Sequence, residues 1–511
     1  VQQYRKQGHM FVPMRMNPEY HKPDDEYPDG RSKMRWIIQG YAEPQSWKQQ
    51  STDAPTPKES TINMLIAEGE HEVESGDEDV VSTGDIGMAF LYADDYDPEE
   101  DGQRFVKYIP FPGAEPEYYE LMGPVYGSTD APLRWHKTFT DWITSEMGYT
   151  QAKNDKCLYV HKKTNHKVTP HVDDCLTRGS KQQTERFWAA AAERFELKGW
   201  GYVMPGGSRV YLSTRISCEC IDGVKWYSKD QERDIRDFLE SEGMVGVRTV
   251  GAPMPSRDEL MQNRAVLDKE TASKVRSQIG SLSYFATKSR PDIVCEVNLA
   301  AQDMQTPRTG TQKAVKRIMA YLSSTADRRL WVPRVTGNKW ECFSDSDHAG
   351  NRRYGDTKSR TGLIILLNGM PLHWRSNKQP ATAMSSATAE IVALSETMKD
   401  MRLRIWIAEE AQIEVIKPMV VQVDNKAAKS FQESTNPASK LQGIFDMRQE
   451  WIQELKNTKE FVVQFVPTDR NLADALTKPV SVAVRKKLDE ELNRIVMKVV
   501  TPSRIRGHKG G

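Results

Sequence analysis

The stretch between residues 340 and 466 restricts most strongly what this chain can fold into. Asn368-Gly369 is a strong hairpin signal, because both positions of a two-residue turn need positive φ. Ser385 and Ser386 are suited to cap a helical pattern that runs to about Ala411. Short apolar runs typical of strands lie around these signals, at 340–344, 363–367, 370–374, 419–423 and 461–466. Three strands, a helix, a strand, a helix and a strand predict one α/β domain of about 140 residues.

Length and composition exclude several classes of protein. The chain has 511 residues, enough for roughly three or four domains. The longest aliphatic run, 363–367, is far too short for a membrane span, so no membrane partner is expected. Six scattered cysteines without zinc-ligand spacing indicate reduced intracellular thiols. No signal peptide is visible, and a start at Val1 is consistent with an excerpt of a longer product.

Charge is unevenly distributed although the net charge is zero. Fourteen Asp or Glu and no Lys or Arg lie between Glu68 and Asp101, whereas basic residues dominate beyond Leu476. Taken alone, each run is typical of a solvated surface, an acidic loop and a basic tail. A neutral chain can still form a local basic groove for phosphates.

A first set of carboxylates precedes residue 180. Asp85 follows a short apolar strand, and Asp173-Asp174 stand at the end of another strand in "HVDDCL". An acid at one strand end and an acid pair beside it can hold two Mg²⁺ ions about 3.5–4 Å apart for an in-line displacement at phosphorus. Mg²⁺ prefers hard oxygen ligands, which explains the residue type. A lone Asp-Asp pair, however, is more often a solvated turn.

The segment Tyr92-Ala93-Asp94-Asp95 is a competing candidate, since it has the tyrosine-plus-two-acids pattern of polymerases. Four more acids follow it before Gly102, and no second strand is present to complete a hairpin. We therefore interpret Asp94 and Asp95 as surface residues.

A second set of carboxylates lies after residue 336. Asp345 ends a strand, Glu390 lies on the long helix, Asp424 ends the next strand and Asp474 opens a short helical turn. Each acid alone is most simply a surface or capping residue. Together, four acids at strand ends and helix starts of one α/β layer are typical of a two-metal nuclease.

Ordered motifs carry a resemblance to a known family. From about Asp29 to Val480 the chain resembles the reverse transcriptase and ribonuclease H region of copia-type long-terminal-repeat (LTR) retrotransposon Pol polyproteins. The motifs that carry this resemblance are "DGRSKMRWIIQGY", "GDIGMAFL", "VYGSTDAPLRW", "HVDD", "IGSLSYFATKSRPDI", "AVKRIMAYL", "FSDSDHAG", "KSRTG", "SNKQP", "SSATAE", "VDNKAA" and "NLADALTKP".

The resemblance implies an α+β polymerase palm and fingers, then a connection- or thumb-like helical region, then an α/β ribonuclease H-like domain. The corresponding boundaries are 1–245, 246–335 and 336–480, followed by a basic C-terminal tail at 481–511. An interruption of the pattern by Pro333, Gly337 and Asn338 supports the boundary near residue 336.

The resemblance also implies roles for individual residues. Phe90 would be the steric gate against a ribonucleotide 2′-hydroxyl, and Lys33 and Arg35 would contact the incoming triphosphate. Tyr126 and Gly127 would lie beside the nascent base pair. The metal ligands and catalytic acids would be Asp85, Asp173 and Asp174 in the polymerase and Asp345, Glu390, Asp424 and Asp474 in the nuclease.

The function implied is RNA-directed DNA polymerase with ribonuclease H activity. Each active site would use two Mg²⁺ ions, or alternatively Mn²⁺. The partners would be an RNA template, a DNA primer, dNTPs and an RNA–DNA hybrid recognised by its shape and 2′-hydroxyls. The implied location is intracellular, in cytoplasmic virus-like particles and alternatively in the nucleus.

Two departures from the family pattern keep other interpretations open. His171 replaces the family's tyrosine, and Pro170 removes an N–H from a strand expected to be central. One alternative is a decayed or domesticated product that binds nucleic acid without polymerising. Another is a chain in which only the nuclease works.

Overall fold

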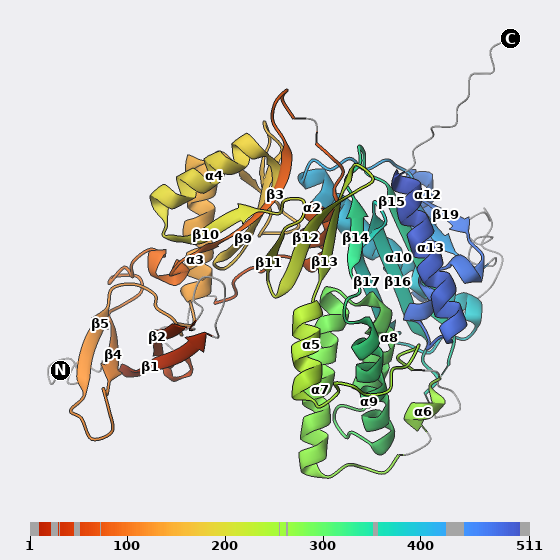
Figure 1. Cartoon of the computed structure of the whole chain (residues 1–511), viewed down its shortest axis with the longest axis horizontal. Helices are drawn as coiled ribbons and strands as arrows, with labels where there is room; N and C mark the ends of the chain where they lie inside the picture. Colours follow the sequence, from red (N-terminus) through yellow and green to blue (C-terminus); the bar gives the residue numbers. More distant parts are fainter. Residues whose placement is uncertain are drawn as a thin grey trace. The chain divides into compact units, whose positions relative to one another are not determined.

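The computed structural model describes residues 10–21, 29, 31–44, 52–71, 73–254, 256–261, 264–350, 356–425 and 444–500 (Figure 1). The chain divides into two compact units. The first comprises residues 1–57, 82–177 and 181–201, and the second comprises residues 58–81, 178–180 and 202–511. Among the residues described, no helix has the length and apolar character needed to span a membrane.

The first unit is built on two sheets. One has the strand order β2 (Arg31–Ile38), β1 (Phe11–His21), β4 (Arg104–Tyr108) and β5 (Glu117–Leu121). The other has the order β10 (Leu197–Tyr202), β3 (Asp79–Ile86), β9 (Asp174–Ser180), β8 (His166–His171), β7 (Tyr159–His161) and β6 (Thr150–Gln151). β3 and β9 are neighbours in the second sheet, so both acid-bearing strand ends belong to it.

Aromatic residues form the core of the first unit. Its helical segments are η1 (Gly40–Ala42), η3 (Ala89–Tyr92), α3 (Ala131–Asp141), the π-helical turn η4 (Trp142–Glu146) and α4 (Lys181–Arg194). The sequence places Trp135, Phe139, Trp142 and Ile143 on one helical face, and all four are buried. Gly84 on β3 leaves room for this packing, because a Cβ there would lie 2.5 Å from the Trp188 ring.

The second unit contains an antiparallel sheet of β11 (Ser208–Tyr211), β12 (Thr214–Ile221), β13 (Val224–Asp230) and β14 (Leu330–Pro333). The sequence pattern predicts one strand over 209–218, and that prediction is wrong. Leu212 and Ser213 have φ of 49° and 58° and form a tight hairpin turn. Neither residue type is favoured at positive φ, so the sequence gives no turn signal there.

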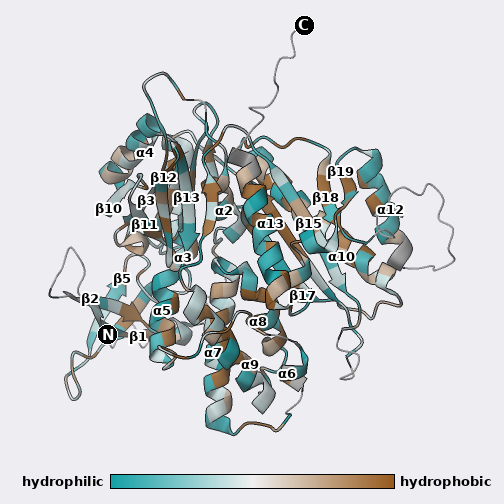
Figure 2. Cartoon of the chain, turned by 45° about the vertical axis from the view of Figure 1, so that its right-hand side comes forward, coloured by the Kyte–Doolittle hydropathy of each residue, from teal (hydrophilic) through white to brown (hydrophobic). Residues whose placement is uncertain are grey.

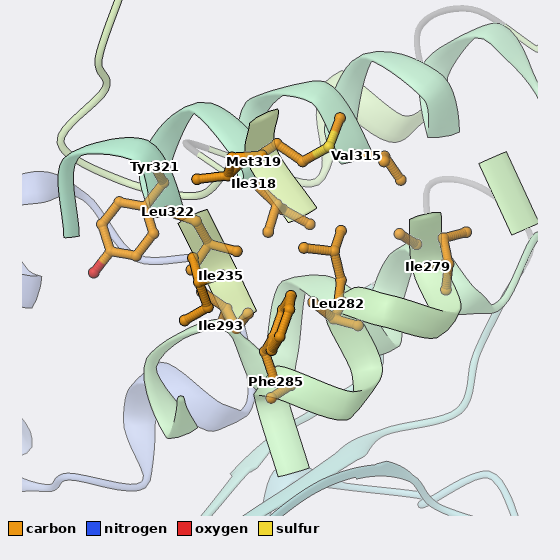
Figure 3. Close-up of a cluster of buried hydrophobic side chains, with 14 of the residues drawn as sticks. Ile235, Ile279, Leu282, Phe285, Ile293, Val315, Ile318, Met319, Tyr321 and Leu322 are labelled. Carbon is orange, nitrogen blue, oxygen red and sulfur yellow. The ribbon is translucent and has the colours of Figure 1, made fainter. Parts of the chain in front are cut away.

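The chain between β13 and β14 is helical: α5 (Glu232–Ser241), α6 (Asp258–Met261), α7 (Lys269–Lys288), η5 (Pro291–Ile293), α8 (Val294–Ala301) and α9 (Thr309–Thr325). Figure 2 shows hydrophilic and hydrophobic residues on the same helices, as on α7. Figure 3 shows that the hydrophobic side chains of α7 and α9 point toward one another. The sequence places Val315, Ile318, Met319 and Leu322 at the i, i+3, i+4 and i+7 spacing of one helical face, and all four are buried in this cluster.

A five-stranded sheet occupies the last part of the second unit. Its order is β17 (Met370–Lys378), β16 (Arg360–Leu367), β15 (Trp340–Asp347), β18 (Met419–Val423) and β19 (Phe461–Phe465). The first three strands are antiparallel, and β18 and β19 run parallel to β15. The helical segments around this sheet are α10 (Ser386–Glu410), α12 (Ile444–Asn457), η7 (Thr468–Arg470) and η8 (Asp474–Leu476).

Local predictions for this sheet are confirmed. Asn368 and Gly369 have φ of 51° and 85° and join β16 to β17. The Ser385 side chain accepts a hydrogen bond from the Thr388 N–H at 3.1 Å and caps α10. The polar N-cap therefore fixes where the Glu390-bearing helix begins.

Two further helices of the second unit are only partly predicted, since the sequence indicates a helix end from Leu65 and a basic tail beyond residue 480. α2 (Glu59–Ala67) is almost wholly buried. α13 (Val482–Val500) occupies part of the segment predicted as a basic tail, and its Leu488 and Ile495 are buried. Arg485 of α13 pairs with the buried Glu296 at 3.0 Å. The interpretation of the whole segment as a solvated basic tail is therefore wrong. Apolar residues lie among its charged residues and pack into the core.

The acidic run from Glu68 to Asp101 is also not uniformly solvated. Asp79 is buried and accepts hydrogen bonds from Arg178 Nε at 3.0 Å and Nη2 at 2.6 Å. Burial would raise the pKa of Asp79, but Arg178 and Arg334 outweigh it and lower that pKa to about 2. Part of the run is therefore internal because a cation from a distant segment neutralises it.

Candidate active sites

The end of β3 lies beside the turn between β8 and β9. The Ile86 N–H donates to the Asp173 carbonyl oxygen at 2.8 Å. Lys198 of β10 donates from Nζ to Asp85 Oδ1 at 2.7 Å and to Oδ2 at 3.0 Å, and it lies 4.0 Å from Asp173 Oδ2. The structure therefore brings together Asp85, Asp173 and Asp174, which we call the palm set, with a lysine ammonium among them.

The turn that carries Asp173 is tight. β8 ends at His171 and β9 begins at Asp174, so Val172 and Asp173 form the connection. Val172 has φ of 58°, a conformation that costs a β-branched residue about 1–3 kcal/mol. Trp135 Nε1 donates to the Val172 carbonyl at 2.6 Å. The surrounding core therefore holds a turn that local preference alone would disfavour.

Electrostatics show that the three carboxylates of the palm set influence one another. The pKa of Asp174 is raised to about 6 by burial, by Asp173 and by Asp85, while Lys198 acts in the opposite direction. A cation stabilises carboxylates that are partly buried and close to one another. The Lys198 ammonium supplies such a positive charge here, so these residues fit a divalent metal ion.

Pro170 is accommodated despite the central position of β8. β7 pairs with β8 from His166 to Val168, where Tyr159 is opposite Val168. Pro170 lies past the end of this short neighbouring strand. The missing N–H therefore falls where the β7 ladder has stopped, which is how a proline can sit near a sheet interior.

The competing pair Asp94 and Asp95 lies in the loop after η3. Both residues are exposed, and the Asp94 N–H donates to Thr138 Oγ1 at 3.2 Å. The turn beside Asp85 is formed instead by Val172 and Asp173. The structure thus separates the two acid pairs, and the exposure of Asp94 and Asp95 agrees with their interpretation as surface residues.

The predicted substrate-contacting residues gather near the palm set. The Phe90 ring packs edge-on against Tyr126 with centroids 5.4 Å apart, and the Arg35 guanidinium lies 5.3 Å from the Tyr126 ring centre. Burial raises the pKa of Tyr126, and the negative charges of Asp173 and Asp85 add to that effect. A cavity of about 560 Å³ lies beside them, lined by Met14, Met34, Arg35, Trp36, Met88, Leu91, Tyr119, Val125 and Tyr126.

Gly127 has a structural reason to be glycine. Its φ is 90°, and a Cβ there would lie 2.2 Å from the Ile38 carbonyl oxygen. The Ile38 N–H donates to the Tyr126 carbonyl at 2.9 Å, so this backbone is locked against the end of β2. Lys33 lies on β2, paired with Glu19, and its side chain lies outside the described residues.

The second set, which we call the nuclease set, lies on the five-stranded sheet and its flanking segments. Ligand oxygens of Asp345, Asp424 and Asp474 all lie within 4.8 Å of one another. Asp345 is on β15, Asp424 directly follows β18, and Asp474 begins η8. Glu390 on α10 completes the set, since it interacts electrostatically with Asp345 and Asp424. Four acids distant in sequence therefore converge.

Burial makes the ionised form of the carboxylates in the nuclease set less favourable. It raises the pKa of Asp345, and Asp424 and Asp474 raise it further, while a hydrogen bond from Thr477 opposes them. Burial likewise raises the pKa of Glu390, with Asp345 as the next cause. Buried carboxylates that repel one another and supply hard oxygen ligands fit a divalent cation.

Polar neighbours that the sequence interpretation missed orient both sets. Thr477 Oγ1 donates to Asp345 Oδ2 at 2.7 Å, and Lys478 Nζ lies 2.7 Å from Asp474 Oδ1. Asn471 Nδ2 donates to the Ser344 carbonyl at 3.1 Å and ties the η8 region to β15. Lys198 was missed in the palm set, because nothing in "ELKGWG" separates it from a surface lysine.

The chain is similar in sequence to known proteins over most of its length. Residues 9–219 match the family described as "Reverse transcriptase (RNA-dependent DNA polymerase)". The chain is 26% identical over 465 residues to the "Retrovirus-related Pol polyprotein from transposon TNT 1-94" of Nicotiana tabacum, covering 88% of this chain and 33% of that protein. It is 27% identical over 368 residues to the polyprotein from transposon RE1 of Arabidopsis thaliana, covering 71% of this chain and 24% of that protein.

A solved structure also has a similar fold. The foamy viral protease-reverse transcriptase "dRH in complex with ds DNA" aligns with a TM-score of 0.52 and 11% identity, covering 91% of this chain and 68% of that one. The likeness at this identity concerns the fold alone. The chain spans about a third of the first polyprotein relative and about a quarter of the second.

These findings define the class: a reverse transcriptase palm and fingers, a helical region and a ribonuclease H-like domain, as the sequence predicts. The chain is similar in sequence to the Pol polyproteins of copia-type LTR retrotransposons, and its residues 9–219 match the reverse transcriptase family.

Proposed function

We propose that the chain is an RNA-directed DNA polymerase with an associated ribonuclease H, and that each activity has its own two-metal site. The observation that carries the proposal is the convergence of distant acids into two separate sets, one beside the β8–β9 turn and one on the five-stranded sheet. A chain that polymerises DNA and also cleaves a hybrid needs one such set for each of the two activities.

In the polymerase, the palm set would hold Mg²⁺, or alternatively Mn²⁺. Bound there, divalent ions would activate the primer 3′-hydroxyl and neutralise the triphosphate. Phe90 would lie against the sugar C2′ of the dNTP, and Tyr126 beside it would support the ring. Gly127 would keep the adjacent backbone close to the nascent base pair, and Arg35 with Lys33 would bind phosphate.

In the nuclease, Asp345, Glu390, Asp424 and Asp474 would hold the second metal pair and cleave RNA in an RNA–DNA hybrid. Thr477 would keep the Asp345 carboxylate oriented through its hydroxyl. The proposed boundaries remain 1–245, 246–335 and 336–480, with residues beyond 480 including α13. The proposed setting is intracellular, in virus-like particles of the cytoplasm and alternatively in the nucleus.

The direct test supplies the purified 511-residue chain with an RNA template annealed to a DNA primer and dNTPs. We expect extension that needs Mg²⁺ or Mn²⁺, and cleavage of the RNA strand of a preformed hybrid. Hybrid binding without either activity would instead favour a decayed or domesticated product. Cleavage without extension would favour a chain in which only the nuclease works.

Phe90→Ala should relax exclusion of ribonucleotides. Removing the ring beside Tyr126 opens space for a 2′-hydroxyl, and a contact of this size is worth roughly 10–100-fold in discrimination. The measurement is the ratio of kcat/KM for a dNTP to that for the matching ribonucleotide. Phe111→Ala, at an aromatic residue that is 67% exposed and does not line the cavity beside Tyr126, is the control. An active Phe90→Ala variant with unchanged discrimination would refute the gate.

Metal should stabilise the fold more at alkaline than at acid pH. The pKa values of Asp345 and Glu390 are raised in the folded chain, so their favourable contribution is present below the ordinary carboxyl pKa near 4 and is lost as pH rises through the raised values. We expect Mg²⁺ to raise Tm at about pH 8 and to add little at about pH 5.

The variant Glu390→Gln tests whether the pH dependence of stabilisation by Mg²⁺ comes from the nuclease set or from other titrating groups. The neutral amide removes one of the repelling charges, so in EDTA at alkaline pH the variant should melt higher than wild type, by roughly 2–4 °C for each kcal/mol relieved. The gain from Mg²⁺ should shrink in the same variant. Equal Mg²⁺ stabilisation of wild type at both pH values would contradict the assignment.

A further inference from the structure

Lys198 contacts both oxygens of the Asp85 carboxylate in the palm set. Its Nζ lies 2.7 Å and 3.0 Å from the two oxygens of Asp85 and 4.0 Å from Asp173 Oδ2. In the nuclease set, Lys478 Nζ lies 2.7 Å from Asp474 Oδ1. Each carboxylate set therefore pairs one of its acids with a lysine ammonium, and in the palm set that acid is Asp85.

The backbone holds Lys198 in this position. The Gly87 N–H donates to the Glu196 carbonyl at 2.6 Å, which joins the start of β10 to the segment after β3. Lys198 Cγ lies 3.4 Å from the point that a Cβ on Gly87 would occupy, so the lysine stem passes over a residue without a side chain. The contact with Asp85 is thus built by neighbouring strands rather than by a freely moving surface lysine.

We propose that Lys198 is a built-in counter-ion that competes with divalent metal for Asp85, so that the palm set binds free metal weakly. This inference rests on the proposed metal-dependent polymerase function of that set. A metal bound to Asp85 would lie close to the Lys198 ammonium, whose Nζ is 2.7 Å from Asp85 Oδ1, and the two cations would repel each other. Metal binding therefore has to overcome this repulsion or displace Lys198 from Asp85.

The exposed fractions of Lys198 and Asp85 indicate how much Lys198 weakens metal binding. The Lys198 and Asp85 side chains are 31% and 37% exposed, so the ion pair itself is worth little, as for other solvent-screened pairs. Losing the pair and the nearby positive charge together should tighten metal binding by roughly three- to tenfold.

The test is a Mn²⁺ titration of the 511-residue chain without nucleic acid, following free Mn²⁺ by electron paramagnetic resonance. Lys198→Met keeps the stem and removes the charge, and it should tighten one class of sites by roughly three- to tenfold. Lys198→Arg keeps the charge and should bind Mn²⁺ as wild type does. Adding Asp173→Asn to Lys198→Met should abolish the gain, and Lys137→Met, at an exposed position on α3, is the matched control.

Unchanged Mn²⁺ affinity in both Lys198→Met and Lys198→Gln, with wild-type melting temperatures, would overturn the inference. So would a gain that survives Asp173→Asn or that appears equally in Lys198→Arg. Primer extension by the wild-type chain tests the proposed function independently. If the chain extends primers but its Mn²⁺ affinity does not depend on Lys198, only the inference about Lys198 is wrong. If the chain does not extend primers, the proposed polymerase function is wrong.

Discussion

Asp173→Asn should reduce Mg²⁺-dependent primer extension by about 10³-fold or more. The substitution keeps the size of the side chain but removes one of the anionic ligands of the palm set. A metal ion supplies several kcal/mol of charge stabilisation in the transition state, and each 1.36 kcal/mol is a tenfold change in rate. Asp173 is 41% exposed, so the asparagine variant should fold normally. Single-turnover extension of an annealed primer measures the loss directly.

The matched control is the double variant Asp94→Asn/Asp95→Asn. It makes the same chemical change at two adjacent acids that follow a tyrosine and alanine, but on the exposed loop after η3. Extension should stay within about twofold of wild type, as for surface substitutions away from a site. If the loop variant loses activity while Asp173→Asn keeps it, the choice between the two acid pairs is wrong.

Local signals in the sequence predicted the elements that carry the sites. Asn368-Gly369 predicted its hairpin because both residues tolerate positive φ, and Ser385 predicted the start of α10 because its hydroxyl can cap a helix. Asp85, Asp345 and Asp424 were recognised because each stands at the end of an apolar strand. These features need only neighbours in sequence, so a single chain reveals them.

Features that depend on distant partners could not be predicted in the same way. Arg178 makes Asp79 an internal residue, but the two are far apart in the chain. The turn at Leu212-Ser213 is imposed by pairing of β11 with β12 against local preference. Lys198 lies on Asp85 only because β10 is the neighbour of β3. Sheet order, which no local pattern encodes, decided the positions of Arg178 and Lys198 beside β3.

Asp424→Asn should abolish cleavage of RNA in a hybrid, by about 10³-fold or more, and leave primer extension within about twofold of wild type. Asp424 directly follows β18, and its carboxylate faces those of Asp345 and Asp474 within 4.8 Å. It is the half-buried member of that trio, so its replacement by a neutral isostere leaves the surrounding core intact. Cleavage of a labelled hybrid and extension of a primer are measured on the same preparation.

Asp469→Asn is the control, because Asp469 is an exposed acid on η7, five residues before Asp474. It should leave both activities unchanged. Selective loss of cleavage in Asp424→Asn, opposite to the selective loss of extension in Asp173→Asn, would require two independent metal centres. Joint loss of both activities in either variant would contradict that separation, since no charge removed from one set should reach the chemistry of another that is formed by different strands.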